Sequence, residues 1–269
     1  MNILEKILPE KKKQVKEEIQ LFPVELLIRS VYYDRECVSL KKHLLREDKS
    51  GIIAEIKKHS PTLGAINPSI SVENLSTGYI QAGASALSVL TDKKFFGGSN
   101  ADLTTARRYN FCPILRKDFV IDKYQIIEAK SIGADAILLI AAILSKEQIA
   151  QFTVLAHKLG MEVILELHDE HELGKINDEI DVIGVNNRNL KTAKIDIGTS
   201  KSMARLIPDG FMKISESGIE DPKIVIDLKQ LGYDGFLIGS YFMKHPEPEK
   251  ACAAFIQQLN KLKKESDAA

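Results

Sequence analysis

The chain has 269 residues, of which 44% are hydrophobic and 28% are charged, as is usual for a folded globular protein. Its 37 Lys and Arg residues balance 37 Asp and Glu residues, so the formal net charge is zero. Proteins that hold nucleic acid usually carry a basic excess, so the composition disfavours that class. No apolar run is long enough for a membrane helix, and charged residues begin at Glu5 with no apolar segment of signal-peptide length, so we expect no membrane span and no signal peptide.

The three cysteines do not form a recognisable pattern. Cys37, Cys112 and Cys252 are widely spaced, odd in number and without a CxxC pair. This disfavours both a disulfide framework and a structural zinc site. Together with the lack of a targeting segment, it leads us to expect a cytoplasmic protein.

The first 48 residues differ from the rest of the chain. They are rich in charge, and their apolar residues recur at the spacing of a helix. Polar residues fill the gaps, including the run Lys11-Lys12-Lys13, which we expect to be a solvated helix face rather than a nucleic-acid patch. We therefore predict an N-terminal helical extension over residues 1–48.

From residue 51 onward, short apolar runs alternate with longer amphipathic stretches. The pattern predicts strands at residues 52–56, 86–90, 113–115, 136–140, 162–167, 182–185, 212–214 and 236–238. It predicts helices at residues 72–81, 101–109, 123–131, 146–159, 170–179, 196–206, 222–231 and 249–262.

This alternation predicts an α/β fold with a parallel sheet. A doubly wound open sheet would also fit the pattern. Eight units in about 220 residues favour a closed (β/α)8 TIM barrel, because closure removes both sheet edges. No linker or shift in composition divides the region, so we predict a single domain over residues 1–269, with residues 1–48 as its extension.

Barrel enzymes carry their active sites at the carboxyl ends of the strands, so the residue that closes each strand is informative. The first predicted strand contains Glu55, and Lys57 follows two positions later, on the same side of an extended chain. An inward-facing charged pair is costly unless it is paired or functional. The alternative is that the strand has already ended and both side chains lie in solvent.

Other strands also end on polar side chains. Lys117 closes the third strand, Glu166 lies at the end of the fifth, and Asn186 follows the sixth, with Arg188 close behind. One such ending is ordinary, but several on one barrel rim indicate an active site.

The last two strands run into small residues instead. Ser217-Gly218 follows the seventh strand, and Gly239-Ser240 follows the eighth. Loops at these two positions commonly bind phosphate through backbone N–H groups in barrels of this kind. Arg188 or Lys57 would supply the countercharge, which indicates a phosphorylated ligand. Ordinary glycine turns are the alternative.

The segment His168-Asp169-Glu170-His171 has two histidines at helical spacing, as some metal sites do. Acidic residues in the first turn of a helix explain Asp169 and Glu170 equally well. We therefore expect no metal site here.

Taken in order, the strand ends resemble those of the indole-3-glycerol phosphate synthase family. The resemblance covers residues 51–244 and rests on separated motifs. These are Ile53-Ala54-Glu55-Ile56-Lys57-Lys58 with Ser60-Pro61, Leu90-Thr91-Asp92, Phe95-Phe96-Gly97-Gly98-Ser99, Lys117-Asp118-Phe119, Glu166, Gly184-Val185-Asn186-Asn187-Arg188, Ser215-Glu216-Ser217-Gly218-Ile219 and Leu237-Ile238-Gly239-Ser240.

The resemblance implies a (β/α)8 barrel whose N-terminal extension helps to cover the active site. It also implies a lyase of tryptophan biosynthesis that closes the indole ring of 1-(2-carboxyphenylamino)-1-deoxyribulose 5-phosphate, with loss of CO2 and water. No metal or organic cofactor takes part in that reaction. The expected partner is therefore this small phosphorylated substrate, not nucleic acid or a membrane. The residues after 244 are similar to a single helix with a polar tail, so by this resemblance we expect the monofunctional form, without a fused second barrel.

The family's catalytic roles map onto five residues of this sequence. By this resemblance, Lys117 is the general acid of ring closure, and Glu166 assists it as acid, base or electrostatic partner. Lys57 and Glu55 form a second pair, which acts near the substrate carboxylate or in dehydration. Asn186 completes the set as a polar contact to the substrate. A lysine acid benefits from a pKa lowered toward neutrality, which burial or neighbouring cations can provide.

The resemblance also assigns the substrate-binding residues. Phe96 and Phe119 match the apolar walls around the anthranilate ring. The remaining positions match polar contacts or the phosphate end, and they are Ser60, Arg188, Glu216, Ser217, Gly218, Gly239 and Ser240.

Two positions depart from the family pattern. His59 stands where a small residue is found in some members, and Asn189 stands where an Asp is common. We expect the first to affect phosphate affinity and the second to affect how Arg188 is held.

Two other functions fit the same residues. One is a Schiff-base aldolase in which Lys117 is the nucleophile. The other is a barrel that binds a phosphorylated ligand without catalysis. Retention of Glu55, Lys57, Lys117 and Glu166 together argues against the second, because phosphate binding alone does not need them.

Overall fold

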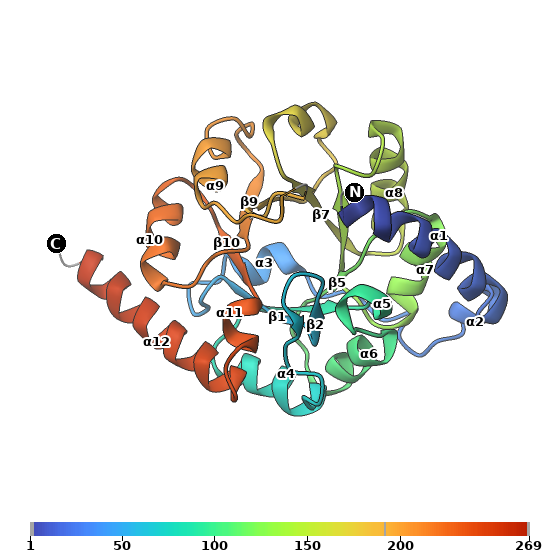
Figure 1. The fold of residues 1–269 in the computed structure, drawn as a ribbon, viewed down its shortest axis with the longest axis horizontal. Helices are drawn as coiled ribbons and strands as arrows, with labels where there is room; N and C mark the ends of the chain where they lie inside the picture. The colour runs from blue at the N-terminus through green and yellow to red at the C-terminus, as the bar shows by residue number, and fades with distance from the viewer. Residues whose placement is uncertain (1–2, 191, 268–269) are drawn as a thin grey trace.

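The structure is a computed structural model that describes residues 3–190 and 192–267. Its centre is a closed barrel of eight parallel strands in the order β1-β10-β9-β8-β7-β6-β5-β4, surrounded by helices (Figure 1). The barrel strands are β1 (Ile52–Ile56), β4 (Ala86–Leu90), β5 (Ile114–Lys117), β6 (Ala136–Ile140), β7 (Glu162–Leu167), β8 (Val182–Asn186), β9 (Met212–Glu216) and β10 (Gly235–Ile238). The TIM-barrel prediction is confirmed, and the open sheet is excluded.

All eight predicted strands are present, and most differences lie at their carboxyl ends. Three of the strands, β5, β8 and β9, continue one or two residues past the apolar runs that revealed them. Lys117 still pairs with Leu90, and Asn186 still pairs with Glu216, in the parallel ladders of the barrel. The polar side chains of the rim are therefore placed by regular strand geometry.

Seven of the predicted helices are present in some form. They are α4 (Val72–Gln81), α6 (Asn100–Tyr109), α7 (Lys123–Ser131), α8 (Lys146–Lys158), α9 (Gly198–Met203), α10 (Pro222–Gln230) and α12 (Pro248–Asp267). Side-chain caps explain where most of them begin: Ser145 and Asp122, for example, form capping boxes with the residue three positions later. The helix predicted at residues 196–206 is reduced to the six residues of α9.

The helix predicted at residues 170–179 is wrong. Only a short 3-10 helix, η1 (Glu170–Lys175), forms there. Lys175 donates from its ammonium to the carbonyl oxygens of Ala141 and Leu144 at 2.6 and 2.9 Å. The segment is therefore held to the loop after β6, and its tertiary contacts override the helical pattern of its sequence.

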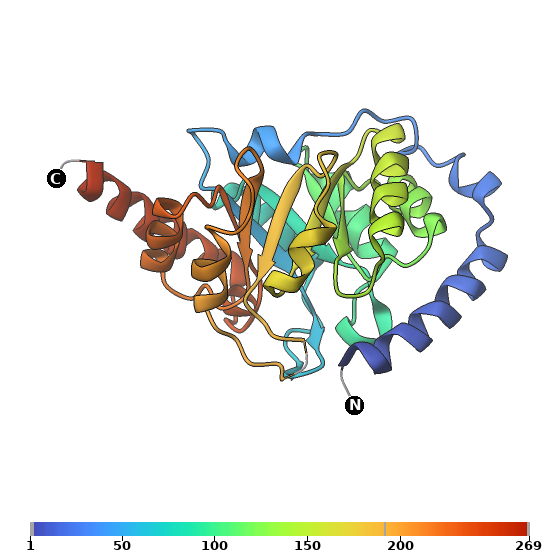
Figure 2. The ribbon, with the colours of Figure 1, turned by 90° about the horizontal axis from the view of Figure 1, so that it is seen from above.

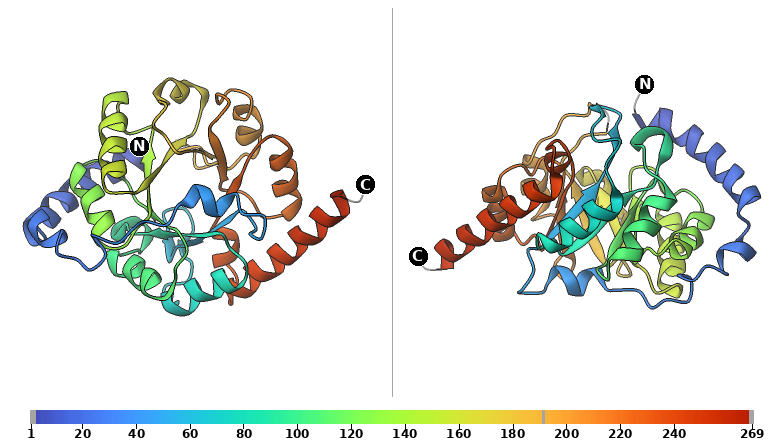
Figure 3. Two further views of the ribbon diagram at one scale, coloured as in Figure 1. Left: turned by 180° about the vertical axis from the view of Figure 1, so that it is seen from behind. Right: turned by 90° about the horizontal axis from the view of Figure 1, so that it is seen from below.

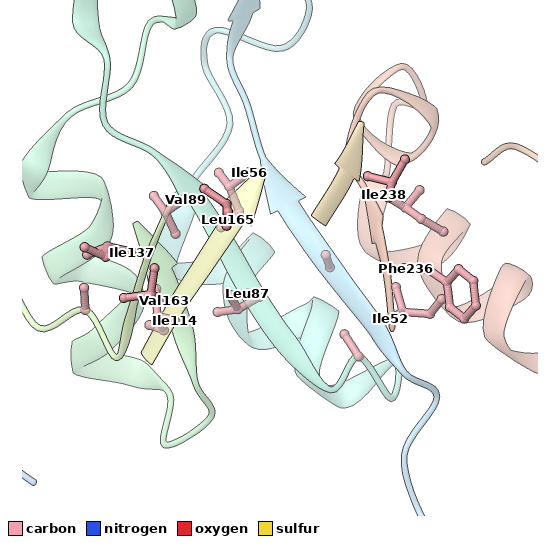
Figure 4. Packing of buried hydrophobic residues seen from close by; sticks show 14 of the residues in the cluster. Ile52, Ile56, Leu87, Val89, Ile114, Ile137, Val163, Leu165, Phe236 and Ile238 are labelled. Carbon is pink, nitrogen blue, oxygen red and sulfur yellow. The ribbon is translucent and has the colours of Figure 1, made fainter. Parts of the chain in front are cut away.

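Alternation along the strands produces two apolar cores. Side chains such as Ile52, Leu87 and Val163 point outward and pack beneath the helices (Figure 4). Side chains such as Ile53 and Ile164 point into the barrel and fill its interior. A period of two residues separates these sets, and it also determines which rim residues face inward.

The N-terminal segment contains α1 (Ile3–Leu21), α2 (Val24–Leu27) and α3 (Leu40–Leu44). Helices α1 and α2 pack against α7, and the Tyr124 hydroxyl donates to the carbonyl oxygens of Glu18 and Phe22. Helix α3 lies at the opposite end of the barrel from the start of α1 (Figure 2), and its Leu40 and Leu44 pack into the barrel interior. Figure 3 shows α1 running along one side of the barrel.

The lysine run in α1 is not uniformly solvated, contrary to prediction. Lys12 and Lys13 are exposed, but Lys11 is only 1% exposed. Two buried aspartates, Asp92 and Asp118, pair with its ammonium. Because these partners come from β-strand ends far along the chain, the run of three lysines did not reveal them.

Short elements that the sequence did not predict lie beside the rim. They are the hairpin of β2 (His59–Ser60) and β3 (Gly64–Ala65), and the helices α5 (Lys93–Phe96) and α11 (Ser240–Met243). Among the described residues, no helix is both long and apolar enough to span a membrane.

Candidate active site

Five polar side chains continue the inward-facing rows of the barrel beyond its apolar filling. Glu55 lies two residues after the inward-facing Ile53, and Lys117, Glu166 and Glu216 follow inward-facing residues in the same way. Asn186 follows Val182 by four residues and has the same parity. The row therefore ends in a cavity of about 330 Å³, which all five residues line.

Lys117 is the centre of this group. Its Nζ lies 2.5 Å from Oε2 of Glu166 and 2.5 Å from Oε2 of Glu216. The lysine side chain is 12% exposed, and both carboxylates are nearly inaccessible. One ammonium thus joins carboxylates from β7 and β9 at the floor of the cavity.

These contacts determine the protonation of the group. Burial alone would lower the pKa of Lys117, but Glu166 and Glu216 outweigh it and raise that pKa above its usual range. The neighbours of Lys117 are thus carboxylates and not the cations that would lower its pKa. Burial raises the pKa of Glu216 to about 7, whereas Lys117 and His168 hold the pKa of Glu166 below its usual range despite burial.

Lys57 and Glu55 form the second pair, as their spacing predicts. The Lys57 ammonium lies 2.7 Å from Oε1 of Glu55, and the two side chains are 12% and 6% exposed. The alternative in which both lie in solvent is therefore wrong. A second ammonium stands at the cavity wall, so a bound ligand would meet two cations.

Two glycines leave room for these carboxylates. A Cβ added at Gly184 would lie 2.7 Å from Oε1 of Glu216 and 3.0 Å from Ile164. A Cβ added at Gly239 would collide with Glu55. Glycine is needed at both positions because the carboxylates occupy the space of a side chain.

One side of the cavity is apolar. Phe96 and Phe119 face each other with ring centroids 6.1 Å apart. Leu90, Leu138 and Ile140 also line the cavity. This wall fits a planar aromatic group.

The opposite side is built from the loops after β8, β9 and β10. Arg188, Ser217, Gly218 and Ser240 line it. Ser217 and Gly218 both have positive φ, 69° and 78°, so two successive residues adopt the left-handed region in one tight turn. Asn187 stabilises this turn, because its side-chain amide donates to the carbonyl oxygens of Glu216 and Ser217.

Of the fourteen residues predicted for the site, Ser60 alone does not line the cavity. Its side chain is buried in the β2–β3 hairpin, where its hydroxyl lies 3.1 Å from that of Thr62. Thr62 and Leu63 line the cavity instead. The hairpin turns Ser60 away from the site, which the strand pattern did not indicate.

The two departures from the family pattern have local contacts. Nδ1 of His59 lies 2.8 Å from the carbonyl oxygen of Phe95, so His59 contacts α5, whose last residue is Phe96. Oδ1 of Asn189 accepts a hydrogen bond from the N–H of Thr192, within its own turn. Arg188 donates to the carbonyl oxygen of Ala193 at 3.3 Å.

Sequence reasoning gave His168 no role, but it lies beside the site. Its Nε2 is 3.2 Å from Oε1 of Glu166, and its Nδ1 is 3.7 Å from Glu172. These carboxylates overcome burial and raise the pKa of His168 to about 9. His171 points into solvent, and the described residues include no cluster of three or more His, Cys, Asp or Glu that could hold a metal ion.

Comparison with known proteins places this arrangement in a family. A family model described as indole-3-glycerol phosphate synthase matches residues 4–255. A protein of that name from Bacteroides thetaiotaomicron is 45% identical over 258 residues, which cover 96% of this chain and 99% of the relative. Another of that name, from Caldanaerobacter subterraneus, is 41% identical over 247 residues, 91% of this chain and 94% of the relative.

Solved structures with little sequence identity share the fold. The 3-hexulose-6-phosphate synthase of Salmonella typhimurium superposes with a TM-score of 0.61 at 13% identity, covering 78% of this chain and 98% of that one. The tryptophan synthase alpha subunit of Legionella pneumophila gives 0.59 at 14% identity, covering 82% and 96%. At this identity the likeness extends to the barrel alone.

Proposed function

Because this chain belongs to the indole-3-glycerol phosphate synthase family, we propose that the cavity at the carboxyl ends of its strands closes the indole ring of 1-(2-carboxyphenylamino)-1-deoxyribulose 5-phosphate. The observation that carries the proposal is the Lys117 ammonium, which lies between Glu166 and Glu216 on the cavity floor. An apolar wall stands on one side of this lysine and a polar loop cluster on the other. The substrate has the same order: an aromatic ring, a carbonyl and a phosphate.

Ring closure joins the aromatic carbon that bears the carboxylate to the substrate carbonyl carbon. The carbonyl oxygen must gain a proton as the bond forms, and Lys117 supplies it as general acid. Its carboxylate neighbours keep it protonated at neutral pH. Loss of CO2 then restores the aromatic ring.

Dehydration needs a second acid and a base. Lys57, held by Glu55, protonates the leaving hydroxyl, and Glu166 accepts the proton that is lost. Lys117 and His168 lower the pKa of Glu166 despite its burial, so this carboxylate is ionised at neutral pH. Asn186 and Glu216 contribute polar contacts to the substrate at the cavity floor.

The two ends of the substrate are held on opposite sides. Phe96 and Phe119 enclose the anthranilate ring. The phosphate binds at Gly218, Gly239 and Ser240, where the backbone can approach it closely. Ser217 lies in the same turn as Gly218, and Arg188 supplies the countercharge. We also propose a cytoplasmic enzyme, because a reducing compartment would preserve its three unpaired cysteines.

The Schiff-base aldolase alternative is disfavoured by the same geometry. A lysine must lose its proton before its nitrogen can attack a carbonyl, and two carboxylates oppose that loss at Lys117. Borohydride reduction in the presence of a keto sugar phosphate should therefore leave Lys117 unmodified. A covalent adduct at Lys117 would favour the aldolase.

Product fluorescence provides a direct test of the proposal. The chain contains no tryptophan, so an indole product is detected against a low background. Incubation of the purified protein with the carboxyphenylamino-deoxyribulose phosphate should produce indole fluorescence and release CO2. The reaction should not require added metal. Substrate that is bound but unchanged would instead support the non-catalytic barrel.

A Ser240→Asp variant tests the phosphate position. An added carboxylate there would repel a phosphate dianion at close range, so we expect KM to rise by about tenfold or more with kcat nearly unchanged. Ser202→Asp, on an exposed face of α9, is the matched control. A normal KM in Ser240→Asp would place the phosphate elsewhere.

A further inference from the structure

Helix α1 directs one lysine into the molecule, where its ammonium meets two loops of the site. Nζ of Lys11 lies 2.7 Å from Oδ2 of Asp92 and 2.8 Å from Oδ1 of Asp118. It also donates to Oε1 of Gln14 at 3.0 Å. A lysine ammonium has three N–H groups, so each of them has an acceptor here. Such a buried cation is costly unless it is fully paired, and this one is.

Each aspartate in turn fixes one aromatic wall of the cavity. Asp92 caps helix α5: its Oδ1 accepts from the N–H of Phe95 at 2.7 Å, next to Phe96. Asp118 accepts from the N–H of Phe119 at 2.7 Å through the same Oδ1 atom that faces the lysine. A single ammonium is thus linked to the backbone beside both rings.

We propose that Lys11 is a positioning residue that sets the spacing of Phe96 and Phe119, and thereby the affinity of the site for the aromatic ring of the substrate. Lys11 does not line the cavity, so it acts through Asp92 and Asp118. The inference rests on the proposed function only in identifying the ring between the two phenylalanines as the anthranilate ring. By this inference, helix α1 helps to position the aromatic wall of the cavity.

A second contact between α1 and α5 does not explain the arrangement. Glu10 and Lys94 lie 2.7 Å apart, but their side chains are 43% and 60% exposed. Exposed ion pairs hold side chains weakly and are screened by salt. The buried contact of Lys11 is therefore the one that can hold α5 in register with the loop after β5.

Removal of Lys11 should loosen the loops without dismantling the barrel. Asp118 keeps the Thr91 hydroxyl at 2.6 Å and Arg116 at 3.4 Å. Arg116 lies in β5, and Thr91 directly follows β4. Asp92 keeps its cap on α5 but loses its cation. Without Lys11, no ammonium joins Asp92 to Asp118, so the distance between the rings of Phe96 and Phe119 is less tightly held.

The test compares Lys11→Met with Lys12→Met, an exposed lysine of the same helix. In Lys11→Met we expect KM to rise about ten- to a hundredfold, because small misplacements at an active site have effects of this size. Affinity for the product indole-3-glycerol phosphate should fall in parallel, while inhibition by inorganic phosphate stays as in the wild type. Lys12→Met should match the wild type in all three measurements.

A merely structural role would give a different result. It would lower the melting temperature and the active fraction while leaving KM unchanged, and that outcome would overturn the inference. Equal weakening of product and phosphate would also overturn it. The turnover of the wild-type protein tests the proposed function separately, since an inactive wild type bears on that function and not on the contacts of Lys11.

Asp92→Asn keeps the test decisive if Lys11→Met does not fold. Asparagine can still cap α5 through its side-chain oxygen, but it has no charge for Lys11 to pair with. We expect its KM to exceed the wild-type value by about severalfold. Lys11→Arg keeps the positive charge, so its KM should stay closer to that of the wild type. A wild-type KM in Asp92→Asn would count against the proposal.

Discussion

At the scale of single residues, Lys117 combines two properties that an acid needs. It is protonated, because Glu166 and Glu216 raise its pKa, and it faces the cavity. Lys117→Ala should lower kcat by about a thousandfold, the usual contribution of a positioned acid, while the product still binds. Stopped assays of indole formation and fluorescence titration with product measure the two effects. Lys123→Ala, an exposed lysine at the start of α7, should behave as the wild type.

A second prediction for a single residue concerns Gly184. An alanine there would displace Glu216 or Ile164, because its Cβ would lie 2.7 and 3.0 Å from them. We expect Gly184→Ala to lower kcat by about ten- to a hundredfold through misplacement of the Glu216–Lys117 pair. Gly174→Ala is the matched control, since a Cβ at Gly174 meets nothing within 4 Å. Unchanged kcat in Gly184→Ala would mean that the position of Glu216 is unimportant.

The inward direction of the rim residues could be predicted, but most of their partners could not. Side chains alternate along a strand, so Glu55 and Lys57 were expected to share a face. The contact of Lys117 with Glu216 joins residues 99 positions apart and depends on barrel closure. The burial of Lys11 likewise depends on strand ends far along the chain. Patterns among neighbouring residues of the sequence do not predict such long-range contacts.

At the scale of elements, strands were predicted more reliably than helices. A barrel strand is covered on both faces, so its sequence is an apolar run that stands out. A surface helix has a weaker signal, and tertiary contacts can replace it, as Lys175 does at η1. The short helices α5 and α11 have four residues each, too few to show any periodicity. These elements lie at the rim, so sequence patterns are least informative where the site is built.

Helix α3 gives a prediction about the end of the barrel away from the site. Leu40 is completely buried against the barrel interior. Leu40→Ala should lower the free energy of unfolding by about 2–5 kcal/mol, through lost burial and the cavity left behind. KM and kcat should stay at wild-type values, since the rim lies at the opposite end. Denaturant titration and steady-state assays check both points, with exposed Leu45→Ala as control.

At the scale of the whole molecule, the zero net charge conceals an uneven distribution. Charges of both signs are buried at the rim and beneath α1, and each buried cation described above has carboxylate partners. Such pairs make the free energy of unfolding depend on pH, because folding shifts their pKa values. The equal numbers of basic and acidic residues, 37 of each, therefore bear on the solubility of the protein. The buried ion pairs determine how its stability responds to pH.

The alkaline side of that response should follow His168. Glu166 and Glu172 outweigh burial and raise its pKa to about 9, from an ordinary value near 6.5. Between pH 6.5 and 9 the folded protein keeps this proton on His168, whereas the unfolded chain releases it. The stabilising contribution of His168 is therefore complete below about pH 6.5 and is lost as the pH rises through about 9. The loss amounts to about 3 kcal/mol of unfolding free energy. Urea titrations from pH 6 to 10 should show this decline in the wild type and in His171→Gln, an exposed control. His168→Gln should remove the part of the decline above about pH 8, where Glu216, with its pKa near 7, is already ionised. An unaltered slope in that range would show that another group is responsible.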